Sequence, residues 1–255
     1  MRALPVILAL LLGGVAAAGE RLAVGPAEFV SVLPTGTTAS AVHVERFLMD
    51  SHPVTNADYL AFVAAHPQWR RGSVATLFAD GDYLSHWASA ETLGASAWPD
   101  RPVTRVSWYA ARAYCEASGA RLPSWYEWEL AAAADEAIPD ARRDANWRAR
   151  ILDWYAQPFS HELPAVGSGP ANFYGLHDLH GMVWEWVEDF DALIVSGDSR
   201  EQGDPDKLKF CGAGALSLRD RENYAVLMRV AFLSSLEARS TAHSLGFRCV
   251  AGAPP

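Results

Sequence analysis

Three cysteines and a closely spaced pair of histidines are the residues of this chain whose types and spacing could support metal or redox chemistry. The cysteines are Cys115, Cys211 and Cys249, and their wide spacing fits no compact zinc motif. His177 and His180 form an H-x-x-H pair, and imidazole suits several transition metals. In an oxidising compartment two cysteines are expected to pair and leave the third unpaired.

A set of aromatic residues in irregular stretches could form a binding surface. Such side chains can line a groove for a peptide or another ligand. They can equally anchor the loops of a fold that has little regular structure, and the sequence slightly favours this second interpretation. The set is Trp69, Tyr83, Trp87, Trp98, Trp147, Trp154 and Tyr155.

The first eighteen residues are typical of a signal peptide. Arg2 provides a positive start, residues 4–15 are apolar, and residues 16–18 are three alanines that suit cleavage. A membrane anchor is the alternative, but the apolar run is shorter than the roughly 20 residues that span a bilayer. We therefore expect cleavage after Ala18, a periplasmic or secreted protein, and no membrane attachment after cleavage.

Residues 19–255 have the length of one large domain, and their composition supports a sizeable core. Half of the full chain is hydrophobic and ten residues are tryptophan. The formal net charge is −9, and the chain has no basic run. This charge argues against nucleic acid as a partner.

The elements that must position these residues are short helices and strands. Three helix signals carry a capping residue: Thr55 or Asn56 before residues 57–63, Ser107 before a helix that Gly119 ends, and Ser124 with Glu127 in a capping box. Strand signals occur at residues 28–33, 42–49, 210–218 and 245–250. Residues 135–170 are expected to be loop with one short helix at most, and residues 224–236 suit either helix or strand.

Five blocks in order resemble the formylglycine-generating enzyme (sulfatase-modifying factor) family. They cover about residues 40 to 250, and the order makes the signal specific. The blocks lie at residues 49–59 (with Pro53-Val54-Thr55-Asn56), 101–115 (Arg101-Pro102-Val103), 119–129 (Gly119-Ala120-Arg121-Leu122-Pro123), 172–186 (Val183-Trp184-Glu185-Trp186) and 245–249 (Leu245-Gly246-Phe247-Arg248-Cys249). The resemblance implies one sulfatase-modifying-factor-like domain over residues 19–255, an α+β fold related to C-type lectins and low in regular secondary structure.

The resemblance also implies which chemistry is missing. The oxidase branch of the family activates oxygen at a copper ion held by two cysteines, and thiolates are ligands that select Cu(I). The corresponding positions here fall near Ser217 or Leu218 and near Asn223, and no cysteine lies between Cys211 and Cys249. Formylglycine formation is therefore not expected, and whether the chain is an enzyme at all stays open.

The three cysteines acquire expected roles from the same resemblance. Cys115 and Cys249 match positions that are disulfide-bonded in some family members, although two buried free thiols are the alternative. Cys211 is the candidate catalytic or metal-binding thiol, against the simpler interpretation of a small buried residue. His243 and Met228 lie in the same C-terminal region, but copper or iron is not supported by a ligand set.

A calcium site is the other metal expectation. In the family, the glutamate matching Glu185 binds calcium with backbone carbonyls that would lie near His180, Gly181 and Val183, and oxygen ligands suit this cation. The alternative is a buried glutamate paired with an arginine such as Arg248. The H-x-x-H histidines are favoured as structural, because a histidine before the glycine is common in the family without a metal role.

Two functions follow as hypotheses. The first is a periplasmic accessory or binding protein that keeps the scaffold without the copper site, with a peptide or a periplasmic redox protein as partner. It could assist maturation of a redox enzyme such as copper nitrite reductase. The second is a metal-dependent oxidase with a non-standard site.

Overall fold

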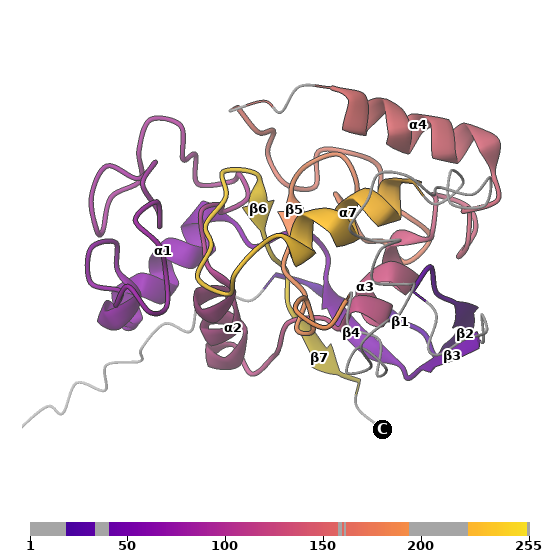
Figure 1. The fold of residues 1–255 in the computed structure, drawn as a ribbon, viewed down its shortest axis with the longest axis horizontal. Helices are drawn as coiled ribbons and strands as arrows, with labels where there is room; N and C mark the ends of the chain where they lie inside the picture. The colour runs from indigo at the N-terminus through magenta and orange to yellow at the C-terminus, as the bar shows by residue number, and fades with distance from the viewer. Residues whose placement is uncertain (1–18, 34–40, 158–159, 161, 194–223, 254–255) are drawn as a thin grey trace, which may run out of the picture.

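The computed structural model describes residues 19–33, 41–157, 160, 162–193 and 224–253. A three-stranded antiparallel sheet lies at its centre, in the order β1 (Arg21–Val24), β4 (Phe47–Asp50) and β7 (Val250–Gly252). Met49 of β4 lies opposite both Leu22 and Val250, so the C-terminal strand closes against strands from the start of the domain (Figure 1).

The expected strand at residues 42–49 is two strands with different partners. Glu45 and Arg46 are exposed and separate β3 (Ala41–Val44) from β4. β3 pairs in antiparallel fashion with β2 (Ala27–Val30), while β4 joins the central sheet. The continuous alternation of apolar residues concealed this change of partner.

The expected C-terminal strand is divided in the same way. β6 (Leu245–Gly246) pairs in parallel with β5 (Trp184–Glu185), and β7 pairs with β4. Phe247, Arg248 and Cys249 lie between the two short strands and are fully buried. The chain therefore turns these three side chains into the core instead of continuing one strand.

Three helices begin where their capping residues predict. Thr55 caps α1 (Asn56–Ala65), Ser107 caps α2 (Trp108–Ala117), and Ser124 caps α3 (Trp125–Ala132). The capping box of Ser124 and Glu127 is present with both of its hydrogen bonds. Gly119 follows α2 with a φ of 69°, a left-handed conformation that glycine adopts without strain.

Two further helices lie in stretches that the sequence left open. α4 (Ala145–Ala156) occupies the stretch expected to be mostly loop; Asp144 caps it, and Trp147 and Ile151 bury one face. The apolar run at residues 224–236 is α7 (Tyr224–Ser234), and a single 3₁₀ turn, η1 (Pro67–Trp69), follows α1. α4 lies along one edge of the molecule and contacts α7 (Figure 1). The expected strand at residues 210–218 lies outside the described residues.

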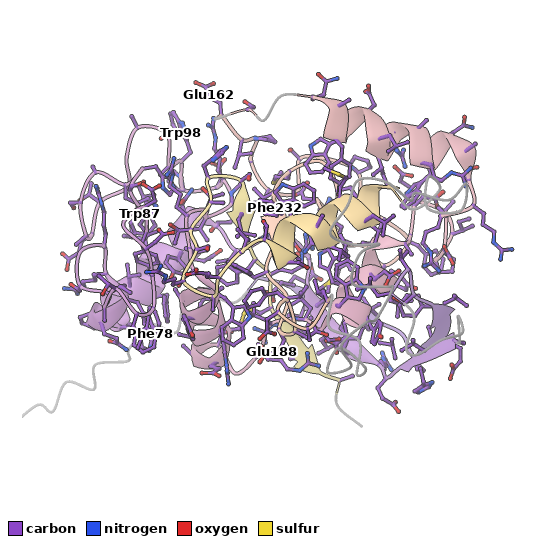
Figure 2. All side chains as sticks on the ribbon, in the orientation of Figure 1. Phe78, Trp87, Trp98, Glu162, Glu188 and Phe232 are labelled. Atoms are coloured by element: carbon purple, nitrogen blue, oxygen red, sulfur yellow. A yellow bond between two sulfur atoms is a disulfide. The ribbon has the colours of Figure 1, made fainter. Side chains whose placement is uncertain are left out.

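One large hydrophobic core joins most of these elements, while Trp147 and Ile151 of α4 form a smaller cluster with Ala141. Its largest fully buried aromatic side chains come from loops as well as helices, and Trp87, Trp125, Trp128 and Trp186 are among them. Side chains fill the interior throughout the described part (Figure 2). Within that part, no helix is both long and apolar enough to cross a membrane.

Candidate functional site

The disulfide expected between Cys115 and Cys249 is present, and both residues are fully buried. It joins α2 to the segment between β6 and β7. Asp50 of β4 also binds this segment, because its carboxylate accepts a hydrogen bond of 2.9 Å from the backbone N–H of Cys249. Two of the three cysteines are thereby used structurally, and Cys211 lies outside the described residues.

Glu185 is at the centre of the buried polar network, where it pairs with Arg248. Arg248 Nη2 lies 2.8 Å from Glu185 Oε1, Nε lies 3.0 Å from both carboxylate oxygens, and both side chains are fully buried. Trp128 Nε1 donates a further bond of 2.8 Å to Oε2. The remaining donors of Arg248 reach the carbonyls of Asp50 and His177.

A second guanidinium, from Arg229 of α7, lies in the same region. It donates to the backbone carbonyl of Glu185 and lies 3.5 Å from the centre of the Trp128 ring. Burial lowers the pKa of Arg229 to about 10, and the nearby Glu185 opposes that shift. Arg229 stays charged at neutral pH, so Glu185 has two cations close to it.

These contacts do not fit the calcium site expected at Glu185, His180, Gly181 and Val183. A bound calcium ion needs carboxylate oxygens free to coordinate it, whereas both oxygens of Glu185 accept hydrogen bonds from Arg248 and Trp128. Two nearby guanidinium groups would also repel the ion. The alternative of a buried glutamate paired with Arg248 is the arrangement that the structure contains.

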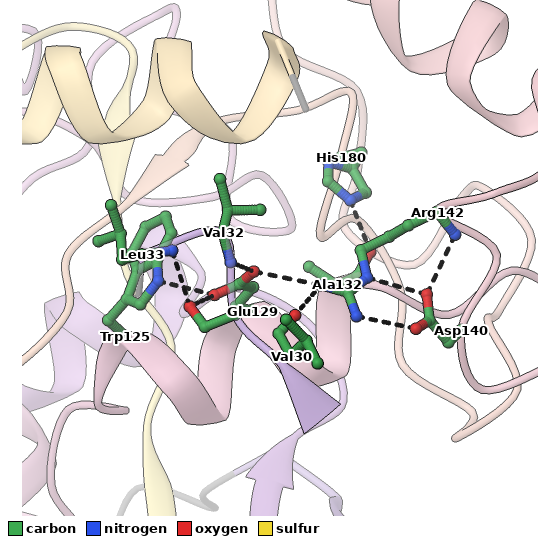
Figure 3. Close-up of polar contacts among 10 residues, drawn as sticks. Val30, Val32, Leu33, Trp125, Glu129, Ala132, Asp140, Arg142 and His180 are labelled. Carbon is green, nitrogen blue, oxygen red and sulfur yellow. Dashed lines mark hydrogen bonds and ion pairs between the residues drawn. The ribbon is translucent and has the colours of Figure 1, made fainter. Parts of the chain in front are cut away.

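His180 and His177 contact different parts of the backbone. His177 Nδ1 lies 2.8 Å from the carbonyl of Gly169, and His180 Nε2 lies 2.8 Å from the carbonyl of Ala132 (Figure 3). The H-x-x-H spacing therefore does not bring the two rings to one ion. Among the described residues, no three His, Cys, Asp or Glu side chains form a metal-binding group.

His180 nevertheless has an unusual environment. Its ring lies edge-on to Trp128 and Trp147, and burial lowers its pKa to about 4. The ring is neutral at pH 7, and the bond to Ala132 places the proton on Nε2. Nδ1 is then a buried acceptor, and it has no hydrogen-bond partner among the described residues.

A cavity of about 230 Å³ lies against His180, between α4 and the loop at residues 169–181. Trp147, Ile151 and Trp154 of α4 form an apolar wall, and an ion pair of 2.9 Å joins Arg150 to Glu136 at its edge. A cavity with an apolar wall and a few polar groups suits a side chain or a short peptide segment.

Gly181, at the end of the loop that lines this cavity, has a backbone conformation that favours glycine. Its φ is 93°, and a Cβ added there would lie 3.6 Å from the Trp154 ring. A side chain at residue 181 would therefore be strained by the backbone conformation, although its Cβ would make an ordinary van der Waals contact with the indole.

The aromatic side chains that the sequence offered either as a binding surface or as loop anchors lie in different environments. Trp147 and Trp154 line the cavity, whereas Tyr83 and Trp87 are buried core residues, and Trp98 is exposed.

Arg229 is a residue of this site that the sequence analysis did not select. The signal that could have found it is its position as the one charged residue inside the apolar run at residues 224–236. Burial of a charge is unfavourable unless the charge has a partner, so such a residue predicts a buried ion pair or hydrogen bond.

A buried carboxylate beside this region connects the N-terminal strands to α3. Glu129 accepts hydrogen bonds from the Ser31 hydroxyl, the backbone N–H of Val32 and Trp125 Nε1, and Arg142 lies 3.3 Å from it (Figure 3). These contacts make Glu129 a structural link between the segment after β2 and α3.

Comparison with known proteins gives consistent matches to one family. The model described as "Sulfatase-modifying factor enzyme 1-like domain" matches residues 8–253. The Formylglycine-generating enzyme of Streptomyces coelicolor is 31% identical over 253 residues, which cover 84% of this chain and 80% of that protein. The bovine Inactive C-alpha-formylglycine-generating enzyme 2 is 29% identical, with the same two coverages.

Other relatives are matched over part of their length. The bovine Formylglycine-generating enzyme is 26% identical, and the match covers 84% of this chain and 67% of that protein. The Serine/threonine-protein kinase pkn1 of Chlamydia caviae is 30% identical, but the match covers 58% of this chain and 24% of the kinase. The chain thus spans about a quarter of this kinase.

Two solved structures share the fold. PvdO from Pseudomonas aeruginosa superposes with a TM-score of 0.52 at 16% identity, over 92% of this chain and 95% of PvdO. CarF superposes with a TM-score of 0.50 at 18% identity, over 94% of this chain and all of CarF. The expected fold is confirmed: an α+β arrangement with a modest amount of regular secondary structure.

Proposed function

This chain belongs to the sulfatase-modifying factor family, and from that premise we propose that it is a non-catalytic accessory or binding protein of the periplasm. One observation carries the proposal. The chain has three cysteines, and the disulfide between Cys115 and Cys249 uses two of them. Cys211 is the one thiol that remains, whereas the copper site of the oxidase branch needs two thiolates.

The positions that correspond to the copper ligands support this proposal from the sequence. They fall near Ser217 or Leu218 and near Asn223, none of which supplies a thiolate. These positions and Cys211 lie outside the described residues. A relative named as inactive among the matches is consistent with a scaffold that persists without the reaction.

The proposed ligand is a peptide segment or a periplasmic redox protein. The cavity between α4 and residues 169–181 supports this choice, because its tryptophan wall can pack against a side chain and Asp135 and Glu136 add polar groups. Export through residues 1–18 would bring the chain to the periplasm or outside the cell. Copper nitrite reductase is the proposed example of a redox enzyme whose maturation it assists, by analogy alone.

A second candidate is a metal-dependent oxidase with a non-standard site that holds copper or iron. The buried Nδ1 of His180, which has no hydrogen-bond partner in the part of the chain that the structure describes, favours it. Metal-binding histidines commonly donate their other N–H to a carbonyl, as His180 does to Ala132. Cys211 would be its candidate thiol. Among the described residues, His180 does not belong to any group of three His, Cys, Asp or Glu side chains that could hold a metal ion.

Metal content and oxygen uptake separate the two candidates. The mature protein should be purified from periplasm and compared with the Cys211→Ser and His180→Gln variants, with His177→Gln as the matched control. The accessory proposal expects no stoichiometric copper or iron and no oxygen uptake above buffer. Stoichiometric metal that is lost in Cys211→Ser or His180→Gln, but kept in His177→Gln, would establish the oxidase instead.

A further inference from the structure

A second cavity lies away from His180, where five segments of the chain meet around the start of α1. Its volume is about 110 Å³, which is the space of about four water molecules in the liquid. Two arginines and two histidines line it together with small polar and apolar groups. The lining residues are Asn56, His86, Ser96, Arg101, Pro102, Thr104, Arg105, Leu163 and His243.

The lining is positively charged, and none of the described lining residues is an Asp or Glu. Arg105 has one carboxylate nearby, Asp82, at the long distance of 3.8 Å. Arg101 lies over the Trp98 ring at 5.4 Å and has no ion pair within the described part of the chain. Other arginines, such as Arg121, lie within hydrogen-bond distance of a carboxylate.

This charge is unexpected in a chain whose formal net charge is −9. Asp82, Asp100 and Glu162 are acidic residues in or next to the same segments, yet none of them lines the cavity. Asp82 lies 3.8 Å from Arg105, and the volume of about 110 Å³ admits only a small ligand. Figure 2 labels two tryptophans beside the lining residues: Trp87, which follows His86 in the sequence, and Trp98, whose ring contacts Arg101.

His86 adds a polar atom with no partner. Its Nδ1 is buried and unbonded among the described residues. Burial, followed by the charges of Arg105 and Arg71, lowers the pKa of His86 to about 4. The ring is therefore neutral at pH 7 and still offers one N–H donor.

The backbone holds these groups in a fixed arrangement. The Leu84 N–H donates to the carbonyl of Arg105 at 3.0 Å, and the Arg105 N–H donates to Ala242 at 3.1 Å. Leu84 and Arg105 have φ values of 47° and 55°, which non-glycine residues rarely adopt. Such conformations persist where the surroundings enforce them, and they occur often at ligand-binding positions.

Hydrogen bonds of Asn56 and close packing at Gly94 hold the segments that form the cavity walls. Asn56 Nδ2 donates to the carbonyls of Trp98 and Arg101, at 3.0 and 3.2 Å. At Gly94, an added Cβ would lie 2.0 Å from the carbonyl oxygen of His86, so only glycine permits this loop to pack there. The cavity is thus formed before any ligand arrives, which reduces the ordering cost of binding.

We propose that this cavity binds one small oxyanion, of the size of a carboxylate or phosphate group, between Arg101 and Arg105. A guanidinium presents paired N–H donors that match two oxygens of such a group. His86 supplies a further neutral donor. The ligand is either a free anion or the terminal carboxylate of a peptide, and the site shares no lining residue with the α4 cavity.

The test is calorimetric titration of the full-length mature protein at constant ionic strength. The probes are inorganic phosphate, N-acetylalanine and N-acetylalanine amide, which has no carboxylate. We expect saturable binding of phosphate, of N-acetylalanine or of both, and none of the amide. Binding of phosphate alone would identify a free anion as the ligand, and binding of N-acetylalanine would identify a peptide terminus.

Charge-removing variants test where the anion binds. Arg101→Gln and Arg105→Gln should each weaken binding at least tenfold, and Arg101→Lys should retain part of it. Arg112→Gln is the matched control, because Arg112 is an exposed arginine on α2 that pairs with Glu116. Equal loss in Arg112→Gln, equal binding of the amide, or absence of binding by both anions would overturn the proposal. Thermal unfolding of each variant without ligand verifies that it is folded.

Discussion

Arg248 and Glu185 form a bidentate ion pair with neither side chain exposed to solvent. Arg248 comes from the segment after β6 and Glu185 from β5, so the pair joins the two strands of the parallel sheet. The Trp128 bond to Glu185 adds α3 to the same network. The glutamate that the sequence suggested as a calcium ligand has both carboxylate oxygens bonded to Arg248 and Trp128 in this structure.

Replacement of Glu185 by Gln should destabilise the protein strongly. Removal of one partner leaves a buried charge without compensation, and here both Arg248 and Arg229 would be affected. We expect a loss of about 3–5 kcal/mol in the free energy of unfolding, measured by urea denaturation. Glu116→Gln, which breaks the exposed pair with Arg112, should cost less than about 1 kcal/mol.

The effect of added calcium on thermal stability tests whether the ion pair is the main role of Glu185. If added calcium raises the melting temperature of the wild-type protein, and Glu185→Gln abolishes that rise, then Glu185 is a calcium ligand and the ion pair is not its main role. We expect the melting temperature to be the same in calcium and in a chelator.

Loss of the Cys115–Cys249 disulfide should also reduce stability. The bridge closes a long loop, and removal of a native disulfide typically costs about 2–5 kcal/mol. The Cys115→Ala/Cys249→Ala double variant should show this loss in chemical denaturation. A Cys211→Ala variant, which keeps the bridge, is the control.

Chemical labelling checks the pairing itself. After non-reducing digestion of the protein, peptides containing Cys115 and Cys249 should be found linked to each other by mass spectrometry. Alkylation of Cys115 without reductant would show that the bridge is absent from the purified protein.

His180 should make the protein sensitive to acid. Its pKa is about 4 in the folded protein and about 6.5 when unfolded. Between these values the unfolded chain binds a proton that the folded chain does not, so stability falls as the pH decreases from 6.5 toward 4. The loss attributable to this residue is at most about 3 kcal/mol.

The His180→Gln variant isolates this effect. The difference in unfolding free energy between wild type and variant should change between pH 7 and pH 4, with the wild type losing more. Burial raises the pKa of Glu129 and Asp50, but both proteins share these groups, so their contributions cancel. A difference that is independent of pH would show that His180 titrates normally. His177→Gln is the matched control.

Local signals predicted the starts of the helices well. Thr55, Ser107 and Ser124 each accept a backbone N–H a few residues ahead, and this interaction needs only neighbouring residues. The sequence allowed one short helix in residues 135–170 but did not place α4, although Asp144 caps it, because most of its surface is polar and few residues mark its buried face. Strand boundaries were wrong where one apolar alternation served two partners, as at β3 and β4.

By itself the sequence determined the family, the caps of three helices and the absence of a second thiol for copper, because each of these depends on which residues are present and in what order. The tertiary structure decided what Glu185 and the basic residues do. Arg229, Arg248 and Trp128 reach Glu185 from distant segments, and Arg101 meets His86 and His243 in the same way. Burial then fixes their roles, since a charge removed from water must find a partner that lies near it in space rather than in sequence.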